Sequence, residues 1–209
     1  SIMDTSGLES FAQNLRTDLL SGVRQRLRYW GFQDDGTVEA EPEEVEGGYT
    51  FRGEVHDDPE VPKKWRALKN AVNRHGIDHV AEEAAYTWFN RLVAIRILEK
   101  NGHLTEMLEH AGDTRRPAVL DRAYDGIINV LGEEESEEVR QAILESDDDR
   151  AFRQLLVGVC HDNDLLNDVF GRLQDYTELL LPTGLLDQEG PVDRLVTTDA
   201  ISDEDYEQV

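Results

Sequence analysis

The chain of 209 residues contains one cysteine, four lysines and only short apolar runs. A single cysteine, Cys160, cannot form an internal disulfide framework or a cysteine-based zinc site. Apolar stretches such as 155–157 and 179–181 are far shorter than the ~20 residues of a membrane span. The chain also opens without a charged and then apolar leader. We therefore expect a soluble, cytoplasmic protein with no membrane partner.

Basic residues are scarce in comparison with acidic ones. The chain has 45 acidic and 21 basic side chains, which gives a formal net charge of −24. A surface rich in carboxylates and poor in lysine is typical of proteins that stay soluble in concentrated salt, where the Debye length falls to ~3 Å. We interpret the charge as halophilic adaptation. A basic partner surface or mimicry of nucleic acid is the alternative that composition leaves open.

The length favours one domain. The spacing of its apolar residues predicts that this domain is mainly α-helical. Ser1 and Ile2 precede the first methionine, so we interpret 1–3 as an expression remnant or the start, and 4–209 as one helical domain. Ser202 followed by three acids resembles the first turn of a helix, and the chain ends at Val209 before an apolar stripe follows. We therefore expect a longer parent protein.

Apolar spacing predicts two long helices. The first covers 8–30, with one apolar stripe and Gly31 as its end. The second covers about 77–100 and is apolar on two faces, which predicts a buried central helix packed on both sides. Its first stripe contains Ile77, Val80, Ala84, Trp88, Leu92 and Ile95, and its second contains Tyr86, Phe89, Val93 and Ile97.

An acidic insertion lies between these two helices. Residues 34–60 contain eleven acids and one base, Arg52, together with several glycines. The stretches 38–41 and 49–52 alternate with period two, which predicts a small β-hairpin within about 37–55. After this insertion, Pro62 can begin a helix that Gly76 ends. Short helices follow beyond Thr105, so the predicted fold is an irregular multi-helix domain.

The only basic concentration lies on the helix that begins near Pro62. Twelve residues from Lys63 to Arg74 contain five basic side chains and no acid. Lys63, Arg66 and Arg74 fall opposite the apolar stripe of this helix, so they are candidates for contact with a DNA backbone. An ordinary solvated helix surface is the alternative.

Charged side chains interrupt the apolar faces of the 77–100 helix. A buried charge must be paired and hydrogen-bonded, so we predict that Arg91, Arg96 and Glu99 form structural ion pairs. Arg96 and Glu99 are three residues apart and can pair along the helix. Arg91 needs a partner from elsewhere in the chain, for example an acid of another helix. Contact with a ligand is the alternative for these residues.

Motifs that would indicate catalysis are missing or weak. The chain has neither a phosphate-binding glycine loop nor a nucleophile elbow. The doublet His161-Asp162 is similar to the ligands of His-Asp metal phosphohydrolases, which gives one alternative function. A histidine that caps a helix C-terminus explains the same doublet without a metal, and we predict none.

One segment carries a resemblance to a known family. The stretch 85–104, AYTWFNRLVAIRILEKNGHL, resembles a segment near the N-terminus of the BREX phage-defence adenine-specific DNA methyltransferases (the PglX family). Related restriction–modification methylases carry a similar pattern. Three further segments, 155–161, 177–182 and 201–209, are similar to later segments of the family, in the same order.

The resemblance implies an accessory role within a larger enzyme. In that family a catalytic domain follows, with a glycine-rich S-adenosylmethionine loop and an Asn-Pro-Pro-Tyr motif that holds the flipped adenine. This chain contains no Pro-Pro dipeptide, so no catalytic or cofactor-binding residue carries over to it. We therefore expect a non-catalytic scaffold for a downstream methyltransferase domain, which would bind S-adenosylmethionine. DNA and other defence proteins are further expected partners, and a freestanding acidic interaction module is the alternative.

Overall fold

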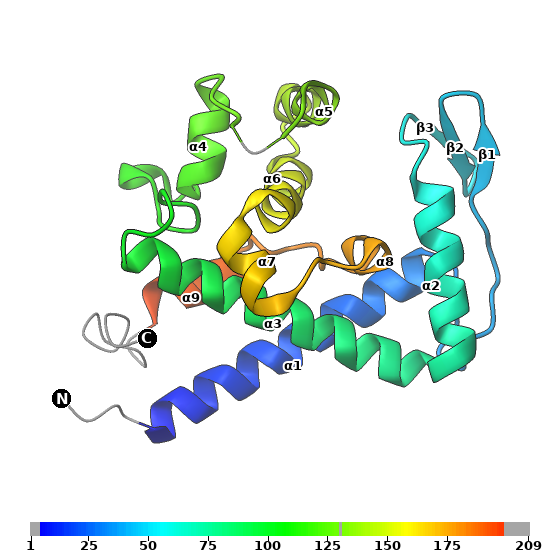
Figure 1. Cartoon of the computed structure of the whole chain (residues 1–209), viewed down its shortest axis with the longest axis horizontal. Coiled ribbons are helices and arrows are strands. Elements are labelled where there is room, and N and C mark those ends of the chain that lie inside the picture. The colour runs from blue at the N-terminus through cyan, green and yellow to red at the C-terminus, as the bar shows by residue number, and fades with distance from the viewer. Residues whose placement is uncertain (1–4, 130, 199–209) are drawn as a thin grey trace. The chain divides into compact units, whose positions relative to one another are not determined.

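The computed structural model describes residues 5–129 and 131–198, and these residues are mainly helical (Figure 1). They form α-helices α1 to α9, one short 3-10 helix and one sheet of three short strands. No helix in these two ranges is long and apolar enough to cross a membrane. The predicted first turn at 202–205 lies outside the described residues. The predicted fold class, a mainly helical chain with a small hairpin insertion, is confirmed.

The described residues form two compact units. Among the described residues, the first comprises 5–18, 89–129, 131–172 and 183–198, and the second comprises Leu19–Trp88 and Leu173–Pro182. The two long helices, α1 (Thr5–Tyr29) and α3 (Ile77–Lys100), each contribute residues to both units.

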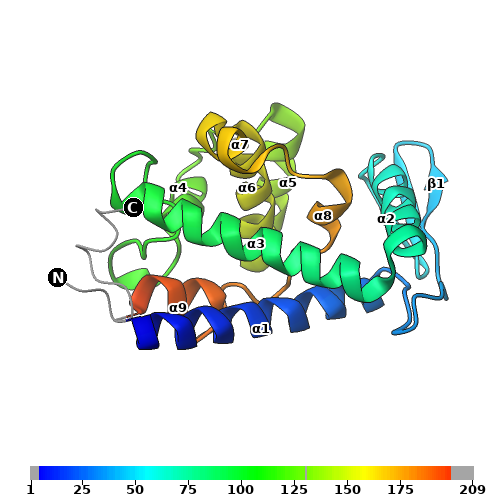
Figure 2. The same cartoon turned by 60° about the horizontal axis from the view of Figure 1, so that its bottom comes forward.

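Helix α3 has the bounds that its apolar spacing predicts, and Figure 2 shows it as one continuous helix. Every member of its first stripe is at most 9% exposed. The second stripe differs from the prediction because Tyr86 is 61% exposed and its other members are only half-buried. The two-sided pattern therefore indicates one fully buried face and one partly covered face.

The second unit contains α2 (Val61–His75), α8 (Asp175–Leu179) and the sheet. Helix α2 buries Trp65, Leu68 and Val72, as its spacing predicts, and packs on α8 and on the middle strand. All three indole groups of the chain lie in this unit and donate hydrogen bonds to backbone carbonyls. The acceptors are Leu179 for Trp30 at 2.8 Å, Trp30 for Trp65 at 2.7 Å, and Thr177 for Trp88 at 3.1 Å.

The sheet pairs different segments from those of the predicted hairpin. Strand β2 (Gly48–Phe51) pairs antiparallel with both β1 (Glu43–Val45) and β3 (Glu54–His56). The predicted partner 38–41 is not in the sheet, and Val38 forms an isolated bridge with Phe32. Tyr49 and Phe51 of β2 are buried and contact the ring of Trp30, whereas all of β1 is exposed. Aromatic packing of β2 thus fixes the sheet.

Backbone crowding explains the glycine that begins β2. A Cβ atom at Gly48 would lie 1.9 Å from the carbonyl oxygen of His56, which no side chain can tolerate. The close approach holds β2 against the end of β3. Strand β1 is an exposed edge strand, and within the sheet it pairs only with β2.

The first unit is built from short helices. Helix α5 (Glu133–Leu144) packs on α6 (Asp148–Asp162), and α4 (Ala118–Tyr124) contacts both of them. Helix α7 (Asp164–Phe170) follows α6 directly. Helix α9 (Pro191–Thr197) lies beside the N-terminal half of α1, where Arg194 forms an ion pair with Asp18 (Figure 2).

Candidate functional site

Helix α2 presents its basic side chains at exposed and half-buried positions. Pro62 lies in the first turn, and the backbone N–H of Gly76 donates to the carbonyl of Val72 at the end of the helix. These end signals and the buried stripe make α2 a regular helix, so its remaining positions form an exposed basic face. The five basic residues on it have different partners.

Lys64 is committed to the fold of the second unit. Its Nζ atom lies 2.7 Å from Oε2 of Glu178 in α8, and the two side chains are 22% and 11% exposed. Burial opposes the charge of Lys64, but the hydrogen bond and the charge of Glu178 outweigh burial. The pKa of Lys64 is therefore raised above its ordinary 10.5. This ion pair joins α2 to α8 and leaves Lys64 unavailable for other anions.

We predict that Lys64→Met lowers the free energy of unfolding by about 1–3 kcal/mol at neutral pH, because Glu178 loses its charged donor. A raised pKa in the folded state contributes stability that is present below the unfolded pKa and is lost as pH rises through the folded pKa. The difference between the wild type and this variant should therefore shrink above pH 10.5. Urea unfolding across a pH series measures it. The adjacent exposed change Lys63→Met should have little effect at any pH; an equal effect would contradict the prediction.

Two further bases of α2 pair with acids of the insertion. Nη1 of Arg66 lies 2.9 Å from Oε1 of Glu44 in β1, and Nζ of Lys69 lies 3.1 Å from Oε1 of Glu41. All four side chains are between 39% and 61% exposed. The sequence pattern placed Arg66 opposite the apolar stripe correctly but did not reveal these partners. The dense acids of 34–60, next to a helix without acids, were the available signal.

Lys63 and Arg74 remain exposed without an ion pair in the described ranges. Of the three candidates for contact with a DNA backbone, these two are therefore accessible, and Arg66 is held by Glu44. The exposed face of α2 thus carries a short row of cations, and two of these cations are paired with acids of the 34–60 insertion.

The charges of α3 form a buried network in the first unit. Nη1 of Arg96 lies 2.8 Å from Oε1 of Glu99 and 2.8 Å from Oε2 of Glu109. The second oxygen of Glu99 accepts hydrogen bonds from the backbone N–H groups of residues 107 to 109, at 2.6, 3.0 and 3.4 Å. The side chains of Arg96 and Glu99 are at most 5% exposed. These contacts hold the loop after α3 in place.

Arg91 has different partners from the acid that we expected. It is 2% exposed, and its Nη2 atom donates to the carbonyl of Gly171 at 2.8 Å. Its guanidinium group also lies 5.6 Å from the ring centroid of Phe170. Within 5–129 and 131–198, no carboxylate forms an ion pair with Arg91. A carbonyl at the end of α7 and an aromatic face therefore take the place of the expected ion pair.

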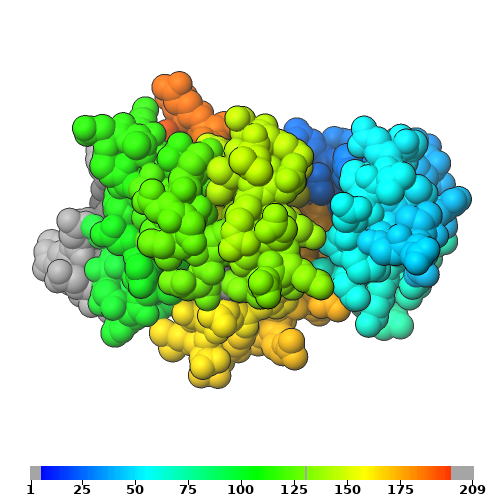
Figure 3. Space-filling model, turned by 90° about the horizontal axis from the view of Figure 1, so that it is seen from above, coloured from blue at the N-terminus to red at the C-terminus, as the bar shows by residue number. Residues whose placement is uncertain are grey.

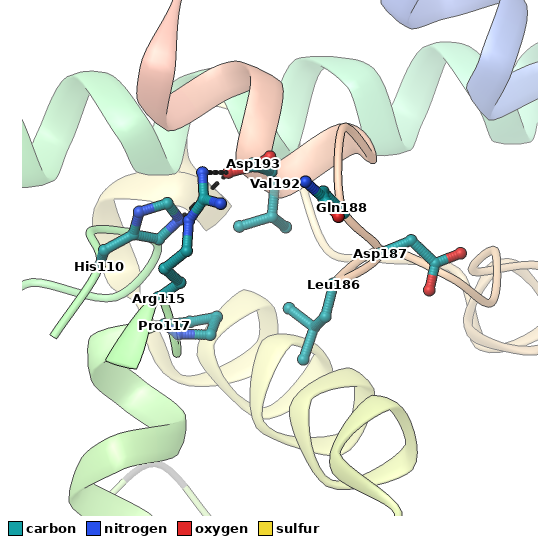
Figure 4. A pocket seen from close by; sticks show the side chains of 8 residues that line it. All are labelled: His110, Arg115, Pro117, Leu186, Asp187, Gln188, Val192 and Asp193. Atoms are coloured by element: carbon teal, nitrogen blue, oxygen red, sulfur yellow. Dashed lines mark ion pairs between the residues drawn. The ribbon is translucent and has the colours of Figure 1, made fainter. Parts of the chain in front are cut away.

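A small cavity of about 240 Å³ lies between the loop after α3 and α9, within the first unit. Figure 4 shows His110 and Arg115 both pointing toward Asp193, with Val192, Leu186 and Pro117 as apolar lining. Nε2 of His110 and Nη2 of Arg115 each lie 3.5 Å from Oδ1 of Asp193. Oδ2 of the same carboxylate accepts from the backbone N–H of Glu189 at 2.9 Å. The carboxylate of Asp193 thus lies against three polar groups of the same unit.

This cavity does not fit S-adenosylmethionine, the cofactor that the resemblance implies for a whole enzyme. Its volume is below the roughly 300–1,000 Å³ of typical small-molecule sites. Asp193, one of its two carboxylates, lies 3.5 Å from both His110 and Arg115 and accepts from the backbone N–H of Glu189. The lining also lacks a Phe, Tyr or Trp ring that could stack on adenine.

The doublet His161-Asp162 ends helix α6. The backbone carbonyl of His161 accepts from the side-chain amide of Asn167 at 3.0 Å. Across the described residues, no three His, Cys, Asp or Glu side chains gather in a way that could hold a metal ion. The phosphohydrolase alternative is therefore not favoured.

Two relatives are similar to the chain over almost its whole length. The adenine-specific methyltransferase BrxX of Escherichia coli O9:H4 (strain HS) is 33% identical over 216 residues, which cover 99% of this chain. The adenine-specific methyltransferase PglX of Lacticaseibacillus casei (strain Zhang) is 26% identical over 224 residues, which cover 98% of it. No protein-family model matches the chain.

The chain spans about a fifth of the length of these curated relatives, 18% in each comparison. The resemblance to the BREX adenine-specific methyltransferases is thereby confirmed, and the small share is consistent with one region of a larger protein. The freestanding-module alternative is not favoured, because nearly every residue of the chain aligns with part of a methyltransferase.

Proposed function

We propose that this chain, similar to BREX adenine-specific methyltransferases over almost its whole length, is the N-terminal accessory region of such an enzyme. It supports and orients a methyltransferase domain that follows in the same polypeptide. The observation that carries the proposal is the pair of matches, which take in 98–99% of this chain but only 18% of each relative.

The chemistry of the chain supports a non-catalytic role. Transfer of a methyl group to an adenine amine requires a pocket that holds the flipped base beside the methyl donor. The chain has no Pro-Pro dipeptide for such a pocket, and the cavity beside Asp193, at about 240 Å³, is smaller than typical small-molecule sites. In this proposal S-adenosylmethionine binds to the following domain, and the longer enzyme acts in phage defence or restriction–modification.

The proposed partners follow from the same reasoning. The first is the methyltransferase domain of the same polypeptide, and others are defence-complex proteins and the DNA backbone. Lys63, Arg66 and Arg74 are the residues of this chain that we assign to backbone contact, because they lie along the exposed face of α2. Phosphate contacts of this kind position a protein on DNA without reading its sequence.

We predict that the isolated chain shows no saturable binding of S-adenosylmethionine in isothermal titration calorimetry. A longer protein that contains this chain and the following domain should bind one equivalent, because its pocket lies in that domain. Saturable binding by the isolated chain would refute the proposal. The calorimetric sample is checked for folding by circular dichroism, so that an absent signal cannot come from an unfolded chain.

A further inference from the structure

Helix α2 and the exposed strand β1 form one charged surface of the second unit. Figure 1 shows the sheet beside α2, and the space-filling view of Figure 3 shows the same segments in light blue and cyan. Glu41 and Glu44 reach from the acidic insertion to Lys69 and Arg66 at 3.1 and 2.9 Å. Two of the cations of α2 are thus neutralised by acids of the same chain.

These two ion pairs contribute little to stability. Their side chains are 39% to 61% exposed, and exposed pairs are worth about 0–1 kcal/mol each. The sheet is held instead by Tyr49 and Phe51 of β2, which are buried against Trp30. All three residues of β1 are exposed. The acids can therefore leave Arg66 and Lys69 without a loss of core packing.

The exposed side of α2 suits the backbone of duplex DNA. At 1.5 Å per residue, the row from Lys63 to Arg74 is about 16 Å long, so it can face several phosphates of one duplex. Trp65 is the only Phe, Tyr or Trp side chain of α2, and it is buried. An exposed aromatic ring is what proteins use to stack the open bases of single strands. Cations without such a ring favour contact with phosphates of a duplex.

We propose that Glu41 and Glu44 compete with DNA phosphate for Lys69 and Arg66, so that the acidic insertion gates a phosphate-binding face on α2. Without DNA the carboxylates hold both cations. A duplex that lies along Lys63 and Arg74 reaches Arg66 and Lys69 only when the two carboxylates turn to solvent, so most wild-type complexes lack these two phosphate contacts. The inference deepens the DNA contact of the proposed function and rests on it for the choice of duplex DNA.

The test compares two double variants of the whole chain. Glu41→Gln/Glu44→Gln frees both cations. Glu43→Gln/Glu46→Gln removes the same charge from the same insertion, but neither acid forms an ion pair with α2 in the described part of the chain. Both variants change the formal net charge from −24 to −22, because each exchange removes one negative charge. The probe is a fluorescently labelled random-sequence duplex, and anisotropy gives its affinity across a salt series.

We expect tighter binding and a steeper salt dependence only for Glu41→Gln/Glu44→Gln. Each added phosphate contact contributes about −0.9 to the slope of log affinity against log salt, so two contribute about −1.8. A fourfold dilution of salt should then strengthen binding about tenfold more than it does for the wild type. The control variant should keep the wild-type slope. Adding Arg66→Gln/Lys69→Gln to the first variant should abolish the gain.

Three outcomes would overturn the inference: an equal gain in both double variants, no gain in either, or a gain that survives loss of Arg66 and Lys69. Circular dichroism and tryptophan fluorescence confirm that each variant is folded, which the exposed positions of the four acids favour. The result is separate from the calorimetric test. Failure here leaves the accessory role intact, whereas binding of S-adenosylmethionine by the chain refutes that role and leaves the salt slopes valid.

Discussion

Replacing Glu99 by alanine should lower the free energy of unfolding by about 3–5 kcal/mol, because it leaves a buried charge without its main partner. The guanidinium group of Arg96 would keep Glu109 as a partner but lose its more deeply buried carboxylate. The backbone N–H groups of residues 107 to 109 would lose their common acceptor at the same time. Met107 and Leu108 are at most 2% exposed, so water cannot easily replace the lost oxygen.

A matched control separates burial from pairing. Glu137 and Arg140 of α5 have the same three-residue spacing as Arg96 and Glu99, but their side chains are 73% and 47% exposed. Glu137→Ala should therefore cost less than about 1 kcal/mol. Urea unfolding followed by circular dichroism measures both losses. Glu99→Gln keeps one oxygen for the backbone N–H groups and should give an intermediate loss. Equal losses for Glu99→Ala and Glu137→Ala would contradict the prediction.

Part of this network follows from sequence and part does not. The three-residue spacing of Arg96 and Glu99 predicts their contact, since such residues are neighbours on a helix. Glu109 and the N–H groups of residues 107 to 109 belong to a loop whose path has no periodic signal. The same limit applies to Arg91. Its position among apolar residues of the helix predicts its burial, but no sequence pattern predicts that its partner is the backbone carbonyl of Gly171.

The same distinction holds for the fold and for α2. Apolar spacing predicts α2 and α3 because each helix has a buried stripe and a glycine or proline at an end. The alternation at 38–41 predicts a strand, but pairing is decided by which neighbours of Tyr49 and Phe51 complete a buried face. That choice depends on contacts across the chain. The basic face of α2 is predictable because it follows from helical spacing. Its ion pairs with Glu41 and Glu44 are not predictable, because they depend on contacts with another segment.

Trp88 carries the second large effect, since it is the largest of the fully buried side chains. Trp88→Ala should lower the free energy of unfolding by about 3–5 kcal/mol, from lost burial and the cavity that remains. Its indole N–H also donates to the carbonyl of Thr177 in α8, at 3.1 Å. Trp88→Phe keeps most of the apolar volume but leaves this carbonyl without its donor, which should cost about 1–3 kcal/mol.

The two other tryptophans allow the destabilisation by the Trp88 variants to be measured within the second unit. Trp30 and Trp65 lie in the second unit, so their fluorescence during urea unfolding reports on the packing that Trp88 supports. Val55→Ala, at a position 70% exposed in the same unit, serves as the control and should change stability by less than 0.5 kcal/mol or so. If Trp88→Phe were as stable as the wild type, the hydrogen bond to Thr177 would contribute nothing. Helix α8 would then depend on Trp30 and Lys64, which bind Leu179 and Glu178.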